Sequence, residues 1–148
     1  MLSDRPNLNQ LIDRQLEIWP EHKKFLCQRF ADPSEDTADF SEELALLILK
    51  LAGDRLDEFC ADYQWMCGNF LEEQVYFKRT GEYRNSSFKE ANKQVYSRPE
   101  YMRRYINGIL LSQVFWYNQV VSLHFYVNRF LSVTPEGARY LEIGPGHG

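Results

Sequence analysis

The sequence predicts a mainly α-helical bundle that ends in a single C-terminal β-strand. Apolar residues recur at three- and four-residue spacing through almost every segment before residue 132, as they do on the buried face of a helix. Asparagine, serine, proline and glycine lie where helices of this spacing would begin and end. Hydrophobic residues make up 44% of the 148 residues, which is enough to fill one core. We therefore expect about five to seven helices in one bundle.

Two short helices are expected first. Asn7 or Asn9 can be the N-cap of the first, because an asparagine side chain accepts a hydrogen bond from a free amide of the first turn. The apolar residues of this helix are Leu8, Leu11, Ile12, Leu16 and Trp19. Pro20 fits the first turn of the second helix, where its missing N–H costs nothing. The apolar residues of the second helix are Phe25, Leu26 and Phe30.

Two longer helices follow an acidic, turn-like segment at residues 31–40. Ser41 is the expected N-cap of the first, since two glutamates come directly after it and favour the positive end of the helix dipole. Gly53 interrupts this helix, and the next runs from Asp54 to Arg79. Gly81 is its expected end, because glycine adopts the left-handed backbone of a C-terminal stop without strain.

A long helix is expected last, over residues 98–131. Ser87–Glu90 and Ser97–Glu100 both have the capping-box pattern of a serine followed three residues later by glutamate, and the second opens this helix. Between Tyr105 and Leu131 the only charged residue is Arg129, which predicts a helix buried around most of its circumference. Polar residues along it argue against a membrane span. They are Asn107, Ser112, Gln113, Asn118, Gln119, Ser122, His124 and Asn128.

Composition excludes several functional classes. The net charge of −4 argues against nucleic-acid binding by the chain as a whole. Cys27, Cys60 and Cys67 are odd in number and lack the spacing of metal ligands, so we expect no metal site and three buried free thiols in a reducing cytoplasm. Residues 78–104 carry eight basic residues against three acidic ones. This segment is either a docking surface for an acidic carrier protein or phosphate-bearing substrate, or the solvated faces of short helices.

The C-terminal segment has the pattern of a strand that runs into a glycine-rich loop. A turn is expected over residues 132–137, followed by a buried strand over residues 138–143. Glu142 lies at the strand end, and the glycines that follow lack the side chains that would keep a ligand from the backbone. These glycines are Gly144, Gly146 and Gly148. The G-x-G-x-G spacing differs from the G-x-G-x-x-G of dinucleotide-binding folds.

Residues 137–148, Gly-Ala-Arg-Tyr-Leu-Glu-Ile-Gly-Pro-Gly-His-Gly, resemble motif I of class I S-adenosylmethionine-dependent methyltransferases. The resemblance implies that the cofactor is S-adenosylmethionine and that Glu142, Gly144, Gly146 and Gly148 bind it. It also implies that residues 132–148 begin a Rossmann-like domain, with residues 1–131 as a helical lid or dimerisation domain. The later elements of that family are missing from this sequence, so we expect the chain to be the inactive N-terminal part of a cytoplasmic enzyme. Its acceptor would be a small molecule, free or bound to a carrier protein.

Three side chains of the long helix are candidates for contact with the cofactor or the substrate. Tyr101 and Tyr105 share one helical face, and their rings could contact a sulfonium cofactor, because aromatic faces attract cations. Packing in the core explains them as well. His124 is a candidate general base for a substrate hydroxyl or amine, or a core histidine with its hydrogen bonds satisfied.

A second hypothesis is a non-catalytic helical interaction or dimerisation module. Apolar surface that has no partner within the chain would promote self-association into a homo-oligomer. An unpaired strand at residues 138–143 could also pair with a copy of itself.

Overall fold

The protein is mainly α-helical in the computed structural model, which describes residues 4–31 and 35–143. The α-helices are α1 (Pro6–Ile18), α2 (Lys23–Arg29), α3 (Glu35–Ala52), α4 (Leu56–Thr80), α5 (Phe88–Ala91), α6 (Pro99–Phe115) and α7 (Tyr117–Phe125). The 3₁₀ turns are η1 (Pro20–His22), η2 (Gly53–Arg55) and η5 (Leu131–Val133), and the π-helical turns are η3 (Asn92–Tyr96) and η4 (Tyr126–Phe130). The helical class expected from the sequence is therefore confirmed.

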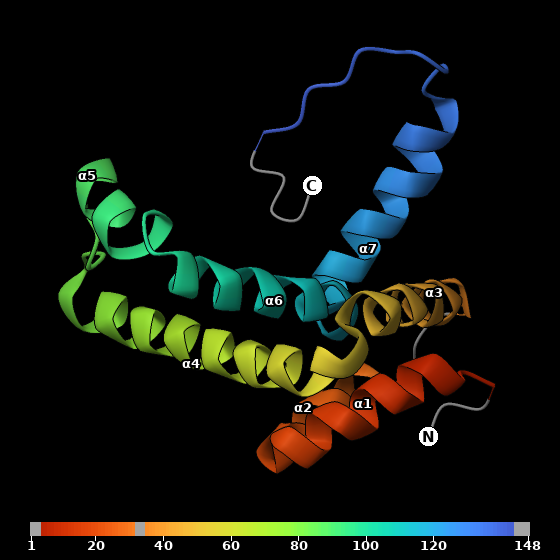
Figure 1. The fold of residues 1–148 in the computed structure, drawn as a ribbon, viewed down its shortest axis with the longest axis horizontal. Coiled ribbons are helices and arrows are strands. Elements are labelled where there is room, and N and C mark those ends of the chain that lie inside the picture. The colour runs from red at the N-terminus through yellow and green to blue at the C-terminus, as the bar shows by residue number, and fades with distance from the viewer. Residues whose placement is uncertain (1–3, 32–34, 144–148) are drawn as a thin grey trace.

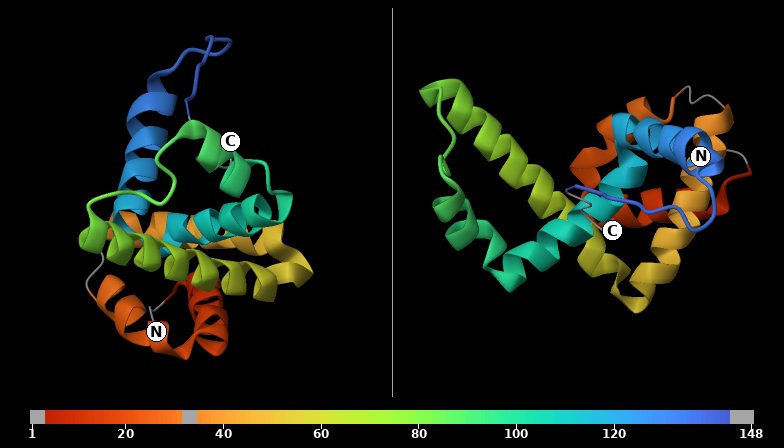
Figure 2. Two further views of the ribbon diagram at one scale, coloured as in Figure 1. Left: turned by 90° about the vertical axis from the view of Figure 1, so that its left-hand side faces the viewer. Right: turned by 90° about the horizontal axis from the view of Figure 1, so that it is seen from above.

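Helices α4 and α6 form a long antiparallel pair around which the other elements are arranged (Figure 1). Helices α1, α2 and α3 pack at one end of this pair, and α5 lies at the other end, where the chain turns back. Helix α7 leaves the end of α6 in a new direction and rises away from the pair, as two further views show (Figure 2). The molecule thus has a packed body and two projecting parts.

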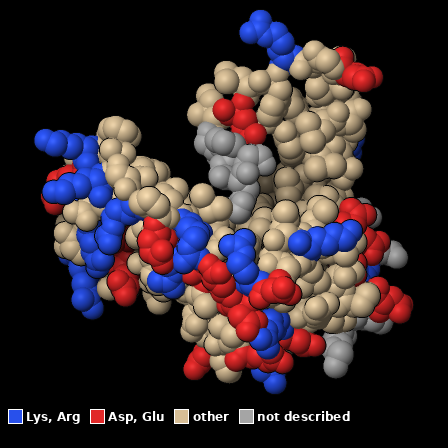
Figure 3. Space-filling model, in the orientation of Figure 1, with Lys and Arg blue, Asp and Glu red and all other residues tan. Residues whose placement is uncertain are grey.

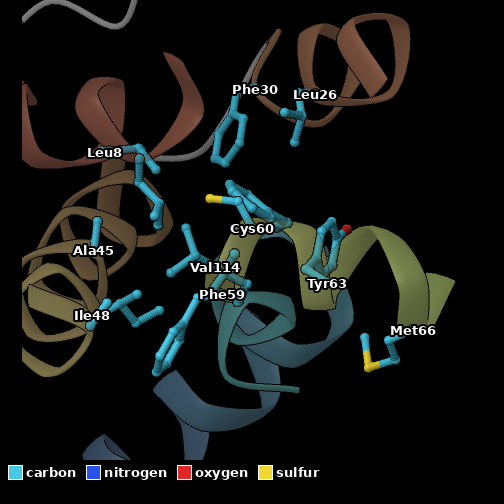
Figure 4. Close-up of a cluster of buried hydrophobic side chains, with 14 residues drawn as sticks. Leu8, Leu26, Phe30, Ala45, Ile48, Phe59, Cys60, Tyr63, Met66 and Val114 are labelled. Atoms are coloured by element: carbon cyan, nitrogen blue, oxygen red, sulfur yellow. The ribbon is translucent and has the colours of Figure 1, made fainter. Parts of the chain in front are cut away.

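The core lies where α1–α3 meet the antiparallel pair (Figure 4). Its buried side chains come from five helices and the residue after α2. They are Leu8, Leu11, Leu26, Phe30, Ala45, Ile48, Ala52, Phe59, Cys60, Tyr63, Met66, Leu111, Val114 and Phe115. Because no element supplies more than a few of them, no helix is expected to keep its shape without its neighbours.

The starts of α1 and α3 differ from the sequence prediction. Helix α1 begins at Pro6, and neither predicted asparagine is its N-cap. The Glu42 carboxylate of α3 instead accepts hydrogen bonds from the backbone N–H groups of Asn7 (3.0 Å) and Leu8 (2.7 Å). Ser41 lies inside α3, where its hydroxyl donates to the carbonyl of Thr37 (2.6 Å), so the predicted N-cap there was wrong.

Helix ends and one capping box follow the prediction. Gly53 and Gly81 both have positive φ (51° and 75°) and follow the last residues of α3 and α4. Ser87 and Glu90 form the predicted capping box at the start of α5. The second one is absent, since Arg98, not Ser97, precedes α6 and makes no side-chain cap.

The predicted single long helix is broken at Trp116. Its first part, α6, packs against α4 and includes the buried residues Leu111, Val114 and Phe115. In its second part, Phe125 of α7 is 64% exposed. The prediction of one buried helix to residue 131 was therefore wrong for its second half. The predicted turn is present, since Ala138 donates its N–H to the Pro135 carbonyl (3.1 Å) around Gly137 at φ 76°. Residues 138–143 form no strand, because the described residues offer none to pair with.

Helices α4 and α6 come closest at Gly108. A Cβ at this position would lie 2.9 Å from both Cβ and Sδ of Met66 and 3.2 Å from the Asp62 carbonyl oxygen. We expect Gly108→Ala to lower the free energy of unfolding by about 1–3 kcal/mol, because the helices must separate. Gly68→Ala on the exposed side of α4 is the control, since nothing lies within 4 Å and alanine favours helix by about 1 kcal/mol. Urea unfolding measures both; a stabilised Gly108→Ala variant would contradict the close approach.

Candidate functional site

Trp116 marks the junction between the packed body and α7. Its backbone is extended (φ −100°, ψ 122°), which ends α6 and starts α7 in another direction. Its N–H still donates to the Ser112 carbonyl (3.0 Å), and its indole Nε1 donates to the Tyr63 hydroxyl (3.0 Å). Burial raises the pKa of Tyr63 above its usual range, so the hydroxyl stays protonated. The indole hydrogen bond to Tyr63 therefore fixes the break between α6 and α7 against α4.

An aromatic cluster with a buried imidazole lies beside this junction. The His22 ring stacks on Trp19 (centroids 4.2 Å apart, 3° between planes) and on Phe25 (4.7 Å, 12°). The edges of Tyr63 and Phe115 complete the cluster. The Nδ1 atom of His22 is out of contact with water and has no hydrogen-bond partner. Burial lowers the pKa of His22 to about 4, because the charged imidazolium would lose its hydration.

The buried imidazole makes stability depend on pH. The unfolded chain binds a proton at His22 below pH 6.5, its ordinary pKa, while the folded protein stays neutral down to about pH 4. Stability from this group is therefore complete above pH 6.5 and falls as pH drops towards 4, with a slope of at most about 1.4 kcal/mol per pH unit. We expect His22→Phe to have a flatter profile between pH 6.5 and 5, where few carboxylates titrate. Urea unfolding at several pH values tests this; parallel profiles would contradict it.

Two largely apolar pockets flank Trp116. The pocket towards α4 has a volume of about 400 Å³ and is lined by Phe70, Glu73, Gln74, Phe77, Lys78, Tyr83 and Trp116. The pocket towards α2 has a volume of about 520 Å³ and is lined by Phe25, Gln28, Arg29, Trp116, Tyr117 and Asn118. Both volumes lie in the range of small-molecule sites.

A third pocket, between α1 and α4, is a weaker candidate. It has a volume of about 690 Å³, but its lining is mainly polar and its one arginine already pairs with two of the lining carboxylates. The Arg14 guanidinium bridges Asp57 and Glu17. Since these ion pairs are exposed and the groove lacks an apolar floor, it offers a ligand less than the two pockets beside Trp116.

The predicted tyrosines lie between α4 and α6. Tyr101 packs edge-on against Trp65 (4.9 Å), and Tyr105 packs against Phe70 (6.1 Å). Burial raises the pKa of both phenols. These contacts are helix packing, which was the alternative explanation for these residues; Phe70 also lines the pocket next to α4.

The other predicted residues lie elsewhere. His124 of α7 is half-buried and packs edge-on against Phe40 of α3 (5.1 Å). Glu142 is exposed on the tail that follows α7. The predicted cofactor-binding residues Gly144, Gly146 and Gly148 lie outside the described residues. Among the described residues, neither tyrosine makes a ring contact or hydrogen bond with His124 or Glu142.

The described tail turns back from the far end of α7 towards the α6 side of the molecule (Figure 1). A hydrogen bond joins the Tyr126 and Tyr140 hydroxyls (2.8 Å), and it raises the pKa of Tyr140 to about 12. Leu141 and Ile143 are 83% and 90% exposed. Tyr140 therefore anchors the tail on η4, where the Phe130 ring also lies near it (centroids 6.0 Å apart), while Leu141 and Ile143 stay uncovered.

Charges gather over the antiparallel pair, whereas α7 and the tail are mainly uncharged (Figure 3). The predicted basic segment is partly neutralised: Arg84 pairs with Glu73 (3.1 Å), Arg104 with Asp62 (2.7 Å), and Arg103 with Glu58. Pairing with acids of α4 favours the solvated-helix explanation over a basic docking surface.

The described residues contain neither a metal-binding cluster nor a membrane-spanning helix. They hold no group of three or more His, Cys, Asp or Glu side chains that could bind a metal ion. None of their helices is long and apolar enough to cross a membrane. Of the free thiols, Cys60 is buried, Cys67 is half-buried and Cys27 is exposed. The expectation that all three are buried was thus wrong for Cys27.

Comparison with known proteins assigns the chain to no family. No protein-family model, curated protein or solved structure matches the chain.

Proposed function

We propose that the chain contributes the helical lid and the start of the cofactor site of a cytoplasmic S-adenosylmethionine-dependent methyltransferase. The observation that carries this proposal is Glu142 followed by three alternating glycines after an apolar segment. Class I methyltransferases place such a loop against the methionine and ribose parts of the cofactor. The methyl group would pass to a small acceptor by direct displacement, with the helices excluding water from the reaction.

The exposed tail is consistent with this proposal. Four of residues 138–143 are apolar or aromatic, and the side chains of Leu141 and Ile143 are uncovered. A parallel strand needs neighbours on both sides, which a Rossmann-like domain would provide. We propose that this segment becomes the first strand of that domain when the rest of the domain is present.

Calorimetry with S-adenosylmethionine tests the proposal. We expect little or no binding to residues 1–148 and measurable binding to a longer chain from the parent gene. In the longer chain, Glu142→Ala should weaken binding about tenfold or more, since one charge-assisted hydrogen bond is lost. His147→Ala is the matched control, because the glycine loop would bind through its backbone. A longer chain that does not bind the cofactor would refute the proposal.

A second function, self-association, is favoured by the apolar surface of α7. Tyr117, Val121 and Phe125 recur every four residues and are exposed, so they form one uncovered row. In this proposal the row packs against a second copy of the chain. Sedimentation of the wild type and of a Val121→Glu variant tests it. A wild type that is monomeric at high concentration would exclude it.

A further inference from the structure

The pocket between α2 and the start of α7 contains an arginine without a counter-charge. Arg29 lies in the last turn of α2, and no ion pair joins its guanidinium to a carboxylate of the described residues. Its Nε and Nη2 atoms are out of contact with water and have no hydrogen-bond partner among the described residues. Buried donors of a charged group cost free energy unless an acceptor reaches them, so this arrangement favours an anion from outside the chain.

The geometry of the two unpartnered nitrogens indicates the kind of anion. Nε and Nη2 form one edge of the planar guanidinium, and their N–H groups point in parallel. A carboxylate accepts both through its two oxygens, which is the bidentate pairing that arginine makes best. The faces of the guanidinium already have partners, because its Cζ lies 4.5 Å from the Phe30 ring centroid and 5.3 Å from that of Tyr117. The edge is therefore the part of Arg29 that lacks a partner.

The rest of the pocket suits an apolar body of moderate size. Its volume is about 520 Å³, and three of its lining residues are aromatic: Phe25, Trp116 and Tyr117. Gln28 and Asn118 add neutral amides that can donate to a second oxygen of the ligand. Since Nε and Nη2 are covered, binding must move a side chain, and Tyr117 is 57% exposed and so the least constrained of the three rings.

We propose that this pocket binds a small aromatic carboxylate, with the carboxylate paired to Arg29 and the ring between Trp116 and Tyr117. The cavity, its aromatic lining and the unpartnered guanidinium edge carry this proposal together. Burial also lowers the pKa of Arg29, as desolvation of an unpaired cation should. The proposal concerns residues 25–118 alone and does not rest on the methyltransferase function.

Calorimetry with 2-naphthoate and 2-naphthylmethanol tests the pocket, since the two probes share a ring system and only the first is an anion. We expect the wild type to bind one 2-naphthoate and to bind the alcohol at least about tenfold more weakly. Arg29→Met should weaken naphthoate binding to the level of the alcohol, while Arg29→Lys should retain part of the preference. Arg55→Met is the matched control, because Arg55 also lies over an aromatic ring (Phe59, 5.4 Å) but outside the pocket.

Three results would overturn the proposal: no naphthoate binding to the wild type, equal affinity for acid and alcohol, or unchanged affinity in a folded Arg29→Met variant. Circular dichroism establishes that the variants fold. Should Arg29→Met not fold, the comparison of acid and alcohol on the wild type decides alone, since it needs no substitution.

Discussion

Replacing Asp62 by alanine should lower the free energy of unfolding by about 3 kcal/mol, because it removes a buried carboxylate and leaves the Arg104 and Asn107 donors without their acceptor. Asp62 of α4 is only 3% exposed. Its carboxylate accepts hydrogen bonds from Arg104 Nε (2.7 Å) and Asn107 Nδ2 (2.9 Å), and Arg103 Nη1 lies 3.5 Å away. All three partners are on α6, so the carboxylate joins the two central helices.

The matched control is Asp57→Ala, one and a half turns earlier on the same helix. Asp57 also pairs with an arginine, Arg14, but this pair is exposed, and water replaces the lost contact. Urea unfolding of the wild type and both variants measures the difference. Equal losses for Asp57→Ala and Asp62→Ala would contradict the role given to burial.

The second large effect is expected from Phe115→Ala, with a loss of about 3–5 kcal/mol in the free energy of unfolding. Phe115 is fully buried at the end of α6 and contacts the rings of Tyr63 (5.2 Å) and His22 (6.3 Å). Removing its ring leaves a cavity where α4, α6 and η1 meet. That cavity also lies beside the junction that directs α7.

Phe125→Ala provides the comparison, because the same residue type lies ten positions later on α7 and is 64% exposed. We expect its effect to stay within about 0.5 kcal/mol, as for other surface substitutions. Thermal unfolding of the two variants separates the buried from the exposed part of the C-terminal helices. A loss at Phe125 as large as that at Phe115 would show that α7 is covered in solution, by a second copy or by a further domain.

The candidate site was only partly predictable from sequence. Tyr101, Tyr105 and His124 were found because their residue types stand out on a helical pattern, yet the first two pack between α4 and α6 and the third packs against α3. Arg29 offered no such pattern, since an arginine on a short helix is normally solvated. Its environment depends on Trp116 and Tyr117, nearly ninety residues further along the chain.

The sequence by itself determined the helical class and those boundaries that local backbone chemistry decides. Gly53 and Gly81 end helices because glycine alone adopts positive φ cheaply, and the Ser87–Glu90 capping box closes within four residues. Only the tertiary structure decided which helices are buried and where α1 begins. The Glu42 cap and the break at Trp116 depend on side chains from distant segments, whose positions no local pattern specifies. An apolar run predicts burial, but a neighbouring element must be present to provide it, and no described element buries the row of Tyr117, Val121 and Phe125 on α7.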